Sequence, residues 1–288
     1  MNNFNDIGRD TVGRITITPE DRRAYDKDGA VILKGIINGF WRERVAEAIE
    51  RDIKNPGPFC HSYDAADGKG RFHGNLRIWE NDPDFRAYCF DSPLPDIAAQ
   101  FFGSSKVNLL YDQLFVKEPG TANPTRWHND QPYWPVRGWE VMSFWLALDP
   151  TTADTGRLEF VKGSHKWDRW FQPEAFGKGS GNVYAHNPNY EKMPDIDANR
   201  EAYDIIGWDM QPGDVIAFHA MAVHSAGGNL REDVRRRGYT VRYTGDQAWY
   251  DTRPGTSEAL MTDELKDGDS MDSSTYPVVW RANNTACA

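Results

Sequence analysis

The chain has 288 residues, of which 39 % are apolar and 13 % aromatic, and it carries a formal net charge of −10. This length suits one domain with a sizeable core, and the acidic balance argues against nucleic acid as a partner, because phosphate backbones are bound by basic surfaces. No stretch approaches the ~20 consecutive apolar residues of a membrane span. The three cysteines, Cys60, Cys89 and Cys287, have no disulfide or zinc spacing. We therefore expect a cytoplasmic protein that binds neither nucleic acid nor membrane.

The first third of the chain predicts a helical front end. Thr18 followed by Pro19, Glu20 and Asp21 supplies the capping residue, the proline and the acids of a helix start. Asn38 caps a second helix. In chain order we expect an arm over 1–17, a helix ending at Asp28-Gly29, a strand over 30–36, a helix to about Asn55, a loop over 55–75 and a helix over 95–102.

From Lys106 onward the pattern changes to short strands separated by turns. We expect strands over 107–117, 141–148, 158–161, 214–218 and 238–243. Many short strands behind a helical front end favour a mainly β fold with flanking helices, a double-sheet jelly roll. We predict one domain over 1–288, with the front end and first strands over 18–105, a jelly-roll core over 106–250 that contains a loop insertion over 166–206, and a surface tail over 251–288.

His128 and Asp130 differ from the other histidines and acids because they stand two positions apart. On an extended chain such residues point to the same face, so an imidazole and a carboxylate can bind one metal ion. A second histidine from a later strand would complete a facial set of three ligands and leave positions open, as iron(II) oxygenases require. On the pair alone, a hydrogen-bonded surface turn is the better interpretation.

The third ligand has two candidates near the end of a later predicted strand. His219 lies within an apolar run and suits a core histidine whose hydrogen bonds are satisfied. His224 lies just before a turn with Gly227 and Gly228, where the backbone can bend toward a site. The pattern slightly favours His224.

A co-substrate with two carboxylates needs a cation at its far end, and arginine is a planar, bidentate and permanently charged partner. Arg235 begins a predicted strand, eleven residues after His224. Alternation places Arg235 and Arg237 on one face and Arg236 on the other, and it does not choose between the first two. For Arg231 and Arg236 the preferred interpretation is a solvated, charged turn.

The predicted strand over 107–117 carries polar groups on an apolar face. Gln113 and Lys117 share that face with leucine, tyrosine and phenylalanine side chains. Buried polar groups need partners, and a polar co-substrate would supply them. An edge strand with both side chains in water is an equally good interpretation.

Five segments resemble the motifs of the phytanoyl-CoA dioxygenase family of iron(II)- and 2-oxoglutarate-dependent oxygenases. They follow the family's order, and the resemblance extends from about Thr18 to about Thr244. The segments are 111–120 (YDQLFVKEPG), 127–134 (WHNDQPYW), 143–149 (SFWLALD), 156–165 (GRLEFVKGSH) and 214–229 with the downstream Arg235.

The resemblance implies a double-stranded β-helix that binds Fe(2+) and uses 2-oxoglutarate and O2. Its catalytic metal ligands would be His128, Asp130 and His224, with His219 as a non-ligand. The family spacing selects Arg235 over Arg237 as the residue that binds 2-oxoglutarate. The resemblance further implies contacts to the co-substrate, or a place in the iron pocket, for Gln113, Lys117 and Trp145.

The reaction implied by the resemblance is hydroxylation of an unactivated C–H bond of a small organic molecule, with release of succinate and CO2. Halogenating relatives replace the metal-binding carboxylate by a small residue, so the intact Asp130 favours hydroxylation or a related desaturation or ring closure. One alternative is a jelly-roll metal protein that uses no oxygen, either a zinc-type isomerase or a small-molecule binding protein. Zinc sites, however, usually have more nitrogen or sulfur ligands. A catalytically silent homologue is the other alternative.

The loops over 55–75 and 166–206 match no family motif, so we expect them to carry substrate specificity as a mobile cover over the iron pocket. Packing on the outside or a homo-oligomer contact is the alternative. The loops contain the aromatic residues Phe59, Tyr63, Phe72, Trp167, Trp170, Phe171 and Tyr184. A flat or apolar substrate is suggested by further aromatic residues expected near the iron, namely Tyr133, Trp134, Trp139, Trp249 and Tyr250.

Overall fold

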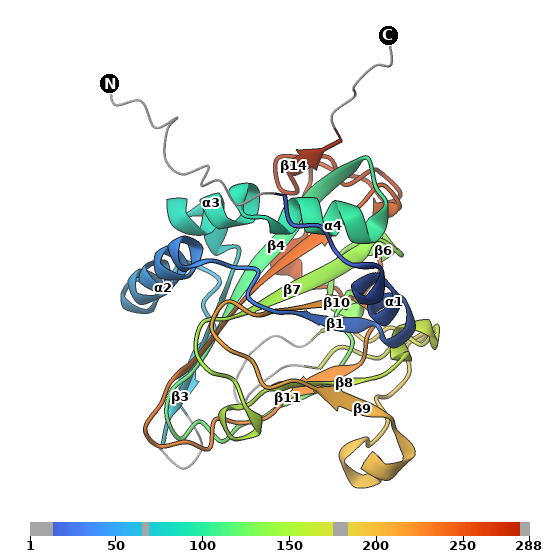
Figure 1. Cartoon of the computed structure of the whole chain (residues 1–288). Coiled ribbons are helices and arrows are strands. Elements are labelled where there is room, and N and C mark those ends of the chain that lie inside the picture. Colours follow the sequence, from blue (N-terminus) through green and yellow to red (C-terminus); the bar gives the residue numbers. More distant parts are fainter. Residues whose placement is uncertain (1–13, 65–68, 175–183, 283–288) are drawn as a thin grey trace, which may run out of the picture.

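The computed structural model describes residues 14–64, 69–174 and 184–282, and two antiparallel sheets form its centre (Figure 1). The larger sheet has the strand order β1-β10-β7-β12-β4-β3-β2, and β14 pairs with β4 beside this path. Its strands are β1 (Ala30–Leu33), β2 (Tyr63–Asp64), β3 (Arg71–Leu76), β4 (Lys106–Lys117), β7 (Val141–Ala147), β10 (Val215–His219), β12 (Arg236–Thr244) and β14 (Val278–Arg281).

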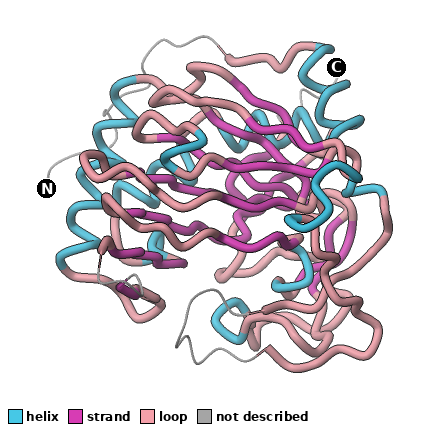
Figure 2. Tube along the Cα trace, turned by 90° about the horizontal axis from the view of Figure 1, so that it is seen from below, coloured by secondary structure: helices cyan, strands magenta, loops and turns pink. Residues whose placement is uncertain are grey.

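The smaller sheet has the order β5-β11-β8-β9, and a separate two-stranded sheet pairs β13 with β6. These strands are β5 (Thr125–His128), β6 (Val136–Gly138), β8 (Leu158–Val161), β9 (Ile205–Gly207), β11 (His224–Ala226) and β13 (Ala248–Tyr250). Figure 2 shows the strands of the larger sheet running side by side across the molecule. The two sheets together form the predicted jelly roll, which is confirmed.

Four α-helices cover one face of the larger sheet, and the smaller sheet lies on its other side (Figure 1). The helices are α1 (Pro19–Asp28), α2 (Gly39–Lys54), α3 (Pro83–Asp91) and α4 (Leu94–Phe102). Short 3-10 helices are η1 (Ile78–Glu80), η2 (Gln131–Tyr133), η3 (Ala153–Thr155), η4 (Ser164–Lys166), η5 (Asp197–Ala202) and η6 (Glu258–Leu260). No helix of the described part of the chain is long and apolar enough to cross a membrane.

Alternation along the strands of the larger sheet creates two cores. In β7, Phe144 and Leu146 belong to the core beneath the helices, whereas Trp145 and Ala147 belong to the core shared with the smaller sheet. Successive side chains of a strand point to opposite faces, so a fully apolar strand can serve both layers. The second face is the one on which a site between the sheets can form.

The caps predicted for the first two helices are confirmed. The Thr18 hydroxyl accepts a hydrogen bond from the Asp21 backbone N–H, and the Asp21 carboxylate accepts one from the Thr18 backbone N–H, which completes a capping box. The Asn38 side chain accepts a hydrogen bond from the backbone N–H of Trp41. The predicted loop over 55–75 is wrong at its end, because β3 pairs with β4 there. The end of this segment is polar in sequence and still forms a strand, because pairing between β3 and β4 satisfies the backbone hydrogen-bonding groups of both strands.

The description of 251–288 as a surface tail also needs correction within the part of it that is described. Leu260, Met271 and Tyr276 are buried in one cluster with residues of the sheets. Strand β14 continues the larger sheet by pairing with β4. A segment with few apolar residues can still be held tightly when those few are buried together.

Candidate active site

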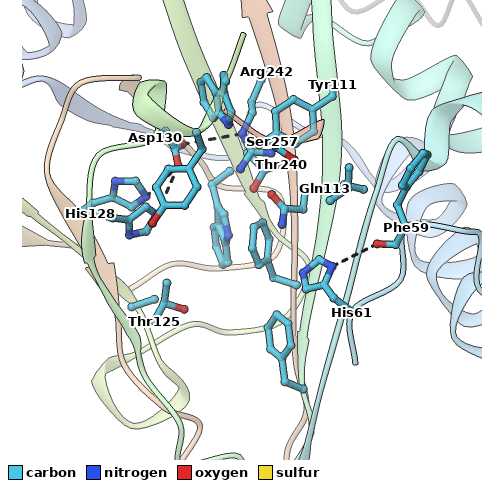
Figure 3. Close-up of a pocket in the computed structure, with 18 of the residues that line it drawn as sticks. Phe59, His61, Tyr111, Gln113, Thr125, His128, Asp130, Thr240, Arg242 and Ser257 are labelled. Atoms are coloured by element: carbon cyan, nitrogen blue, oxygen red, sulfur yellow. Dashed lines mark hydrogen bonds and ion pairs between the residues drawn. The ribbon is translucent and has the colours of Figure 1, made fainter. Parts of the chain in front are cut away.

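Three side chains that can hold a metal ion meet where β5 and β11 pair. His128 ends β5, His224 begins β11, and the two residues stand opposite each other in the register. The Nε2 atom of His128 lies 3.4 Å from Oδ1 of Asp130, and the Nε2 atom of His224 lies 4.0 Å from the same oxygen. Candidate ligand atoms of all three residues lie within 4.8 Å of one another. The pair at i and i+2 and the distant histidine are thus brought together as expected, and Figure 3 shows His128 and Asp130 beside the cavity.

Backbone carbonyls orient both imidazoles of this cluster. The Nδ1 atom of His128 lies 2.8 Å from the carbonyl oxygen of Arg126, and that of His224 lies 3.0 Å from the carbonyl oxygen of Ala222. An Nδ1–H that donates to a carbonyl leaves the Nε2 lone pair for a metal ion. Burial, followed by the nearby His128, lowers the pKa of His224 to about 4. This imidazole is therefore neutral at neutral pH, as a ligand must be.

Asp130 is ionised in the same cluster. Its burial opposes ionisation, but His224, His128 and Arg242 outweigh that effect, so its pKa lies below the ordinary value of a carboxyl group. The Ser143 hydroxyl also donates a hydrogen bond to its Oδ2 atom, at 3.3 Å. Two imidazoles and one carboxylate form a donor set of the kind that binds iron(II) in oxygenases.

His219 is a buried histidine with both ring nitrogens occupied. Its Nε2 lies 2.9 Å from the carbonyl oxygen of Trp139, and its Nδ1 accepts a hydrogen bond from the backbone N–H of Met221. Burial, followed by the nearby His165, lowers its pKa to about 3. No lone pair is left for a metal ion, which agrees with the interpretation of His219 as a core residue.

A cavity of about 360 Å³ opens beside the three metal-binding candidates, between the two sheets. Its walls include Gln113, Lys117 and Trp145, the three residues for which pocket positions were expected. Gln113 and Lys117 come from β4 and Trp145 comes from β7. Figure 3 shows Gln113 and Thr240 pointing toward each other in this space.

The structure separates Arg235 from this cavity. Its guanidinium group forms ion pairs with Glu50 at 2.8 Å and Glu118 at 2.7 Å, and one third of its side chain is exposed. Arg236, by contrast, lines the cavity and is 2 % exposed. The interpretation of Arg236 as a solvated charge is therefore wrong, and the placement of Arg235 argues against its predicted contact with the co-substrate. Strand β12 begins at Arg236, and alternation turns this side chain inward.

Two buried basic side chains lie next to each other in the wall of the cavity. Arg236 stands opposite Lys117 in the register of β12 and β4. The Lys117 ammonium group donates to the carbonyl oxygens of Gly227 and Asn123, and its burial, followed by the nearby Arg236, lowers its pKa well below the usual range. Burial lowers the pKa of Arg236 to about 10, so this side chain is charged at neutral pH. Its hydrogen bonds to the carbonyl oxygens of Thr155 and Phe115 are both 3.4 Å long, which leaves room for a better acceptor.

Several wall residues were missed by the sequence analysis. Thr240 and Arg242 follow Arg236 on the inward face of β12, and alternation from Arg236 would have indicated them. Ser257 and Leu260 come from the C-terminal segment. No local pattern marks those two, because only the path of the chain brings them to the wall.

The loop aromatics divide into two groups. Phe59, Tyr63, Phe72 and Tyr184 line the cavity, as expected for residues that select a substrate. Trp167 and Phe171 instead pack in a separate apolar cluster, and Trp170 stacks on Tyr190. Residues 65–68 and 175–183 of the predicted cover lie outside the described residues.

The other expected aromatics divide in the same way. Tyr133 and Trp134 line the cavity. Trp139 and Trp249 are 53 % and 40 % exposed and do not line the cavity, so the expectation that they lie near the iron is not met. Tyr250 is buried against Tyr276, away from the cavity walls.

The comparisons with known proteins agree with this geometry. The family model described as Phytanoyl-CoA dioxygenase (PhyH) matches residues 25–238. A probable phytanoyl-CoA dioxygenase of Caenorhabditis elegans is 25 % identical over 266 residues, which cover 86 % of this chain and 82 % of that protein. The peroxisomal phytanoyl-CoA dioxygenase of Mus musculus is 24 % identical over 242 residues, which cover 78 % of this chain and 68 % of that protein.

Two solved structures share the fold. The non-heme alpha ketoglutarate dependent carbocyclase SnoK from nogalamycin biosynthesis has a TM-score of 0.73 and 20 % identity, with 92 % of this chain and 97 % of that chain covered. The epimerase SnoN in complex with Fe3+, alpha ketoglutarate and nogalamycin RO has a TM-score of 0.70 and 21 % identity, with 91 % and 98 % covered. Because the family model matches most of the chain, this protein belongs to the phytanoyl-CoA dioxygenase family and is an iron- and 2-oxoglutarate-dependent dioxygenase.

Proposed function

We propose that this enzyme hydroxylates an unactivated C–H bond of a small organic molecule while it converts 2-oxoglutarate to succinate and CO2. The observation that carries the proposal is the cluster of His128, Asp130 and His224 at the wall of a cavity that the buried basic side chains of Arg236 and Lys117 also line. Iron bound by these three residues would supply the reaction of 2-oxoglutarate with O2. The intact carboxylate at Asp130 supports hydroxylation over halogenation.

Arg236 is the proposed partner of the distal carboxylate of 2-oxoglutarate. It is charged and buried in the cavity wall, and its present hydrogen bonds are long. A guanidinium group can form two parallel hydrogen bonds with a carboxylate. Lys117 lies opposite Arg236, and a carboxylate bound beside it would favour its protonated, positively charged form.

Trp145 and Gln113 complete the proposed co-substrate site. The Trp145 ring lies 5.5 Å from the guanidinium carbon of Arg236, which keeps that group from swinging away. Gln113 offers both a donor and an acceptor to a polar guest. We place a small-molecule substrate in the remaining space of the cavity.

The proposed compartment is the cytoplasm. The low number of cysteines supports it, because proteins of oxidising compartments often carry disulfide bonds.

The test begins with metal binding. Titration of the metal-free protein with iron(II) under anaerobic conditions should give one ion per chain. His224→Ala should weaken binding by more than the roughly 10- to 100-fold that loss of an outer hydrogen-bond partner produces. His219→Gln is the control and should bind iron as the wild type does. If His219→Gln loses iron and His224→Ala keeps it, the ligand assignment is wrong.

The second step separates an oxygenase from a metal protein that uses no oxygen. With iron(II), 2-oxoglutarate and air, the wild-type enzyme should form succinate, and the rate should rise when a substrate is present. Zinc in place of iron should abolish succinate formation. A protein that binds zinc and forms no succinate with iron would instead be the isomerase or binding protein.

A further inference from the structure

Arg242 is a buried cation of the cavity wall that lacks a hydrogen-bond acceptor. It is 3 % exposed, and its Nε and Nη1 atoms are buried without a hydrogen-bond partner. Its nearest anionic neighbour is Asp130, whose Oδ2 lies 3.9 Å from Nε, beyond hydrogen-bond distance. Figure 3 shows this guanidinium group beside Asp130 at the upper end of the cavity.

Two aromatic rings hold the Arg242 side chain in place. Its guanidinium carbon lies 4.4 Å from the ring centre of Tyr111 and 5.2 Å from that of Trp134. Cation–π contacts fix the plane of the group but satisfy none of its N–H donors. The donors are therefore directed by the fold and left without acceptors, which is unfavourable in a buried site unless a ligand supplies one.

Arg253 shows how this chain satisfies an arginine that is purely structural. Its guanidinium group donates to the backbone carbonyls of Gln131, Trp134 and Val136 and pairs with Asp251. It does not line the cavity. Arg242 is more deeply buried than Arg253 and has none of these acceptors, so packing alone does not explain it.

The position of Arg242 argues against the distal carboxylate of 2-oxoglutarate as its partner. Arg236 and Arg242 point to the same face of β12 and stand six residues apart, which separates their Cα atoms by roughly 20 Å along the strand. Arg242 lies beside the candidate metal ligand Asp130, whereas the distal carboxylate of a metal-bound 2-oxoglutarate would lie farther from the metal. A five-carbon diacid that is bound to the metal and to Arg236 leaves Arg242 for another acceptor.

We propose that Arg242 binds the carboxylate of the organic substrate, which makes this enzyme an oxygenase of small carboxylic acids. The inference rests on the proposed function and adds the substrate class. A carboxylate neutralises the buried cation and accepts two hydrogen bonds, whereas a thioester or amide carbonyl supplies no charge. Thr240, whose hydroxyl is buried without a partner, lies two positions before Arg242 on the same face and can donate to the same acid.

The rest of the cavity defines the body of that acid. Phe72, Phe115, Leu76 and Leu260 also line this cavity. An apolar or aromatic chain is the guest that such walls select. Because the acid group would be held next to Asp130, the oxidised carbon should lie close to the carboxylate.

The first experiment compares acids with their uncharged analogues. The wild-type protein, loaded with iron(II) and 2-oxoglutarate under anaerobic conditions, is titrated with phenylacetate, 3-phenylpropionate and octanoate and with the corresponding primary amides. Binding is followed by the shift in melting temperature and by calorimetry. We expect the acids to bind at least tenfold more tightly than the amides. Equal binding of acids and amides, or no binding of any acid, would overturn the proposal without the use of a variant.

The second experiment uses Arg242→Gln and Arg242→Lys, with the affinities for acid, 2-oxoglutarate and iron measured separately. Arg242→Gln should weaken acid binding roughly ten- to a hundredfold, as loss of a charged hydrogen bond does. Its affinities for 2-oxoglutarate and iron should stay within about threefold of wild type, and Arg242→Lys should restore acid binding in part.

Other patterns assign Arg242 a different role. An equal loss of 2-oxoglutarate affinity in Arg242→Gln would mean that Arg242 serves the metal-bound carboxylate of the co-substrate. An equal loss of iron affinity would mean that it only holds Asp130. Either result overturns the proposal. If wild-type protein binds the acids through Arg242 but forms no succinate, the proposed function fails and the acid site stands.

Discussion

Arg235 and Arg236 are adjacent in sequence and have opposite surroundings. Arg235 pairs with Glu50 and Glu118 at the surface, whereas Arg236 is buried in the wall of the cavity. A shift of one residue along a strand moves a side chain to the other face, so the exact start of β12 decides which arginine faces the cavity. The number of residues after His224 does not decide between Arg235 and Arg236, because the turn between β11 and β12 can contain one residue more or less.

The residue-scale prediction concerns 2-oxoglutarate affinity. Arg236→Lys should weaken binding roughly tenfold and Arg236→Ala up to about a hundredfold, because a bidentate charged contact is lost. Arg235→Ala is the control and should stay within about threefold of wild type. Calorimetry of the iron-loaded protein under anaerobic conditions gives the affinities, and melting curves verify that each variant is folded. The reverse order, with Arg235→Ala as the weak binder, would restore the first assignment.

Strand β12 forms much of the cavity wall beside the metal-binding candidates. Its inward face carries Arg236, Gly238, Thr240 and Arg242, so one strand supplies two buried arginines, a hydroxyl group and a gap between them. The gap at Gly238 is needed, because a Cβ atom there would lie 2.1 Å from Cζ2 of Trp145. Only glycine lets the indole of β7 lie across β12 beside Arg236.

The element-scale prediction is that Gly238→Ala displaces the Trp145 indole. Such overpacking should lower the free energy of unfolding by about 1–3 kcal/mol and weaken 2-oxoglutarate binding. Urea unfolding and calorimetry measure the two effects. Gly39→Ala is the matched control, because its nearest heavy atom would be 3.7 Å away, an ordinary contact. If Gly238→Ala is as stable and binds as well as the control, the close packing of Trp145 has no role in the site.

At the scale of the whole molecule, segments that are distant in the sequence close the cavity. Phe59 and His61 reach it from the segment before β3, and Ser257 and Leu260 reach it from beyond β13. Leu260 also packs with Met271 and Tyr276, so the C-terminal segment belongs to both the core and the wall. Stability and substrate binding are therefore coupled in this segment.

The whole-molecule prediction compares two neighbours in the C-terminal segment. Leu260→Ala should lower the free energy of unfolding by about 2–4 kcal/mol, because it leaves a hole in a buried cluster. Met261→Ala should change it by no more than about 0.5 kcal/mol, since Met261 is 38 % exposed. Urea unfolding at one pH measures both. Equal effects would show that the described part of this segment, 251–282, is a surface tail as the sequence predicted.

The sequence alone predicted the family and the jelly roll, and both are confirmed. It also picked out His128, Asp130 and His224, because strand alternation and ordered motifs are local properties that survive without coordinates. The helix caps at Thr18 and Asn38 were predictable for the same reason.

The tertiary structure decided what depends on register and on long-range contact. It turned Arg236 and not Arg235 toward the cavity, because one residue of register reverses the face. It showed that the end of the predicted loop forms β3, because the adjacent strand β4 pairs with its backbone groups. It also placed Leu260 in the wall and left Arg242 buried without an acceptor, because burial is a property of everything that packs around a side chain and not of its neighbours in sequence.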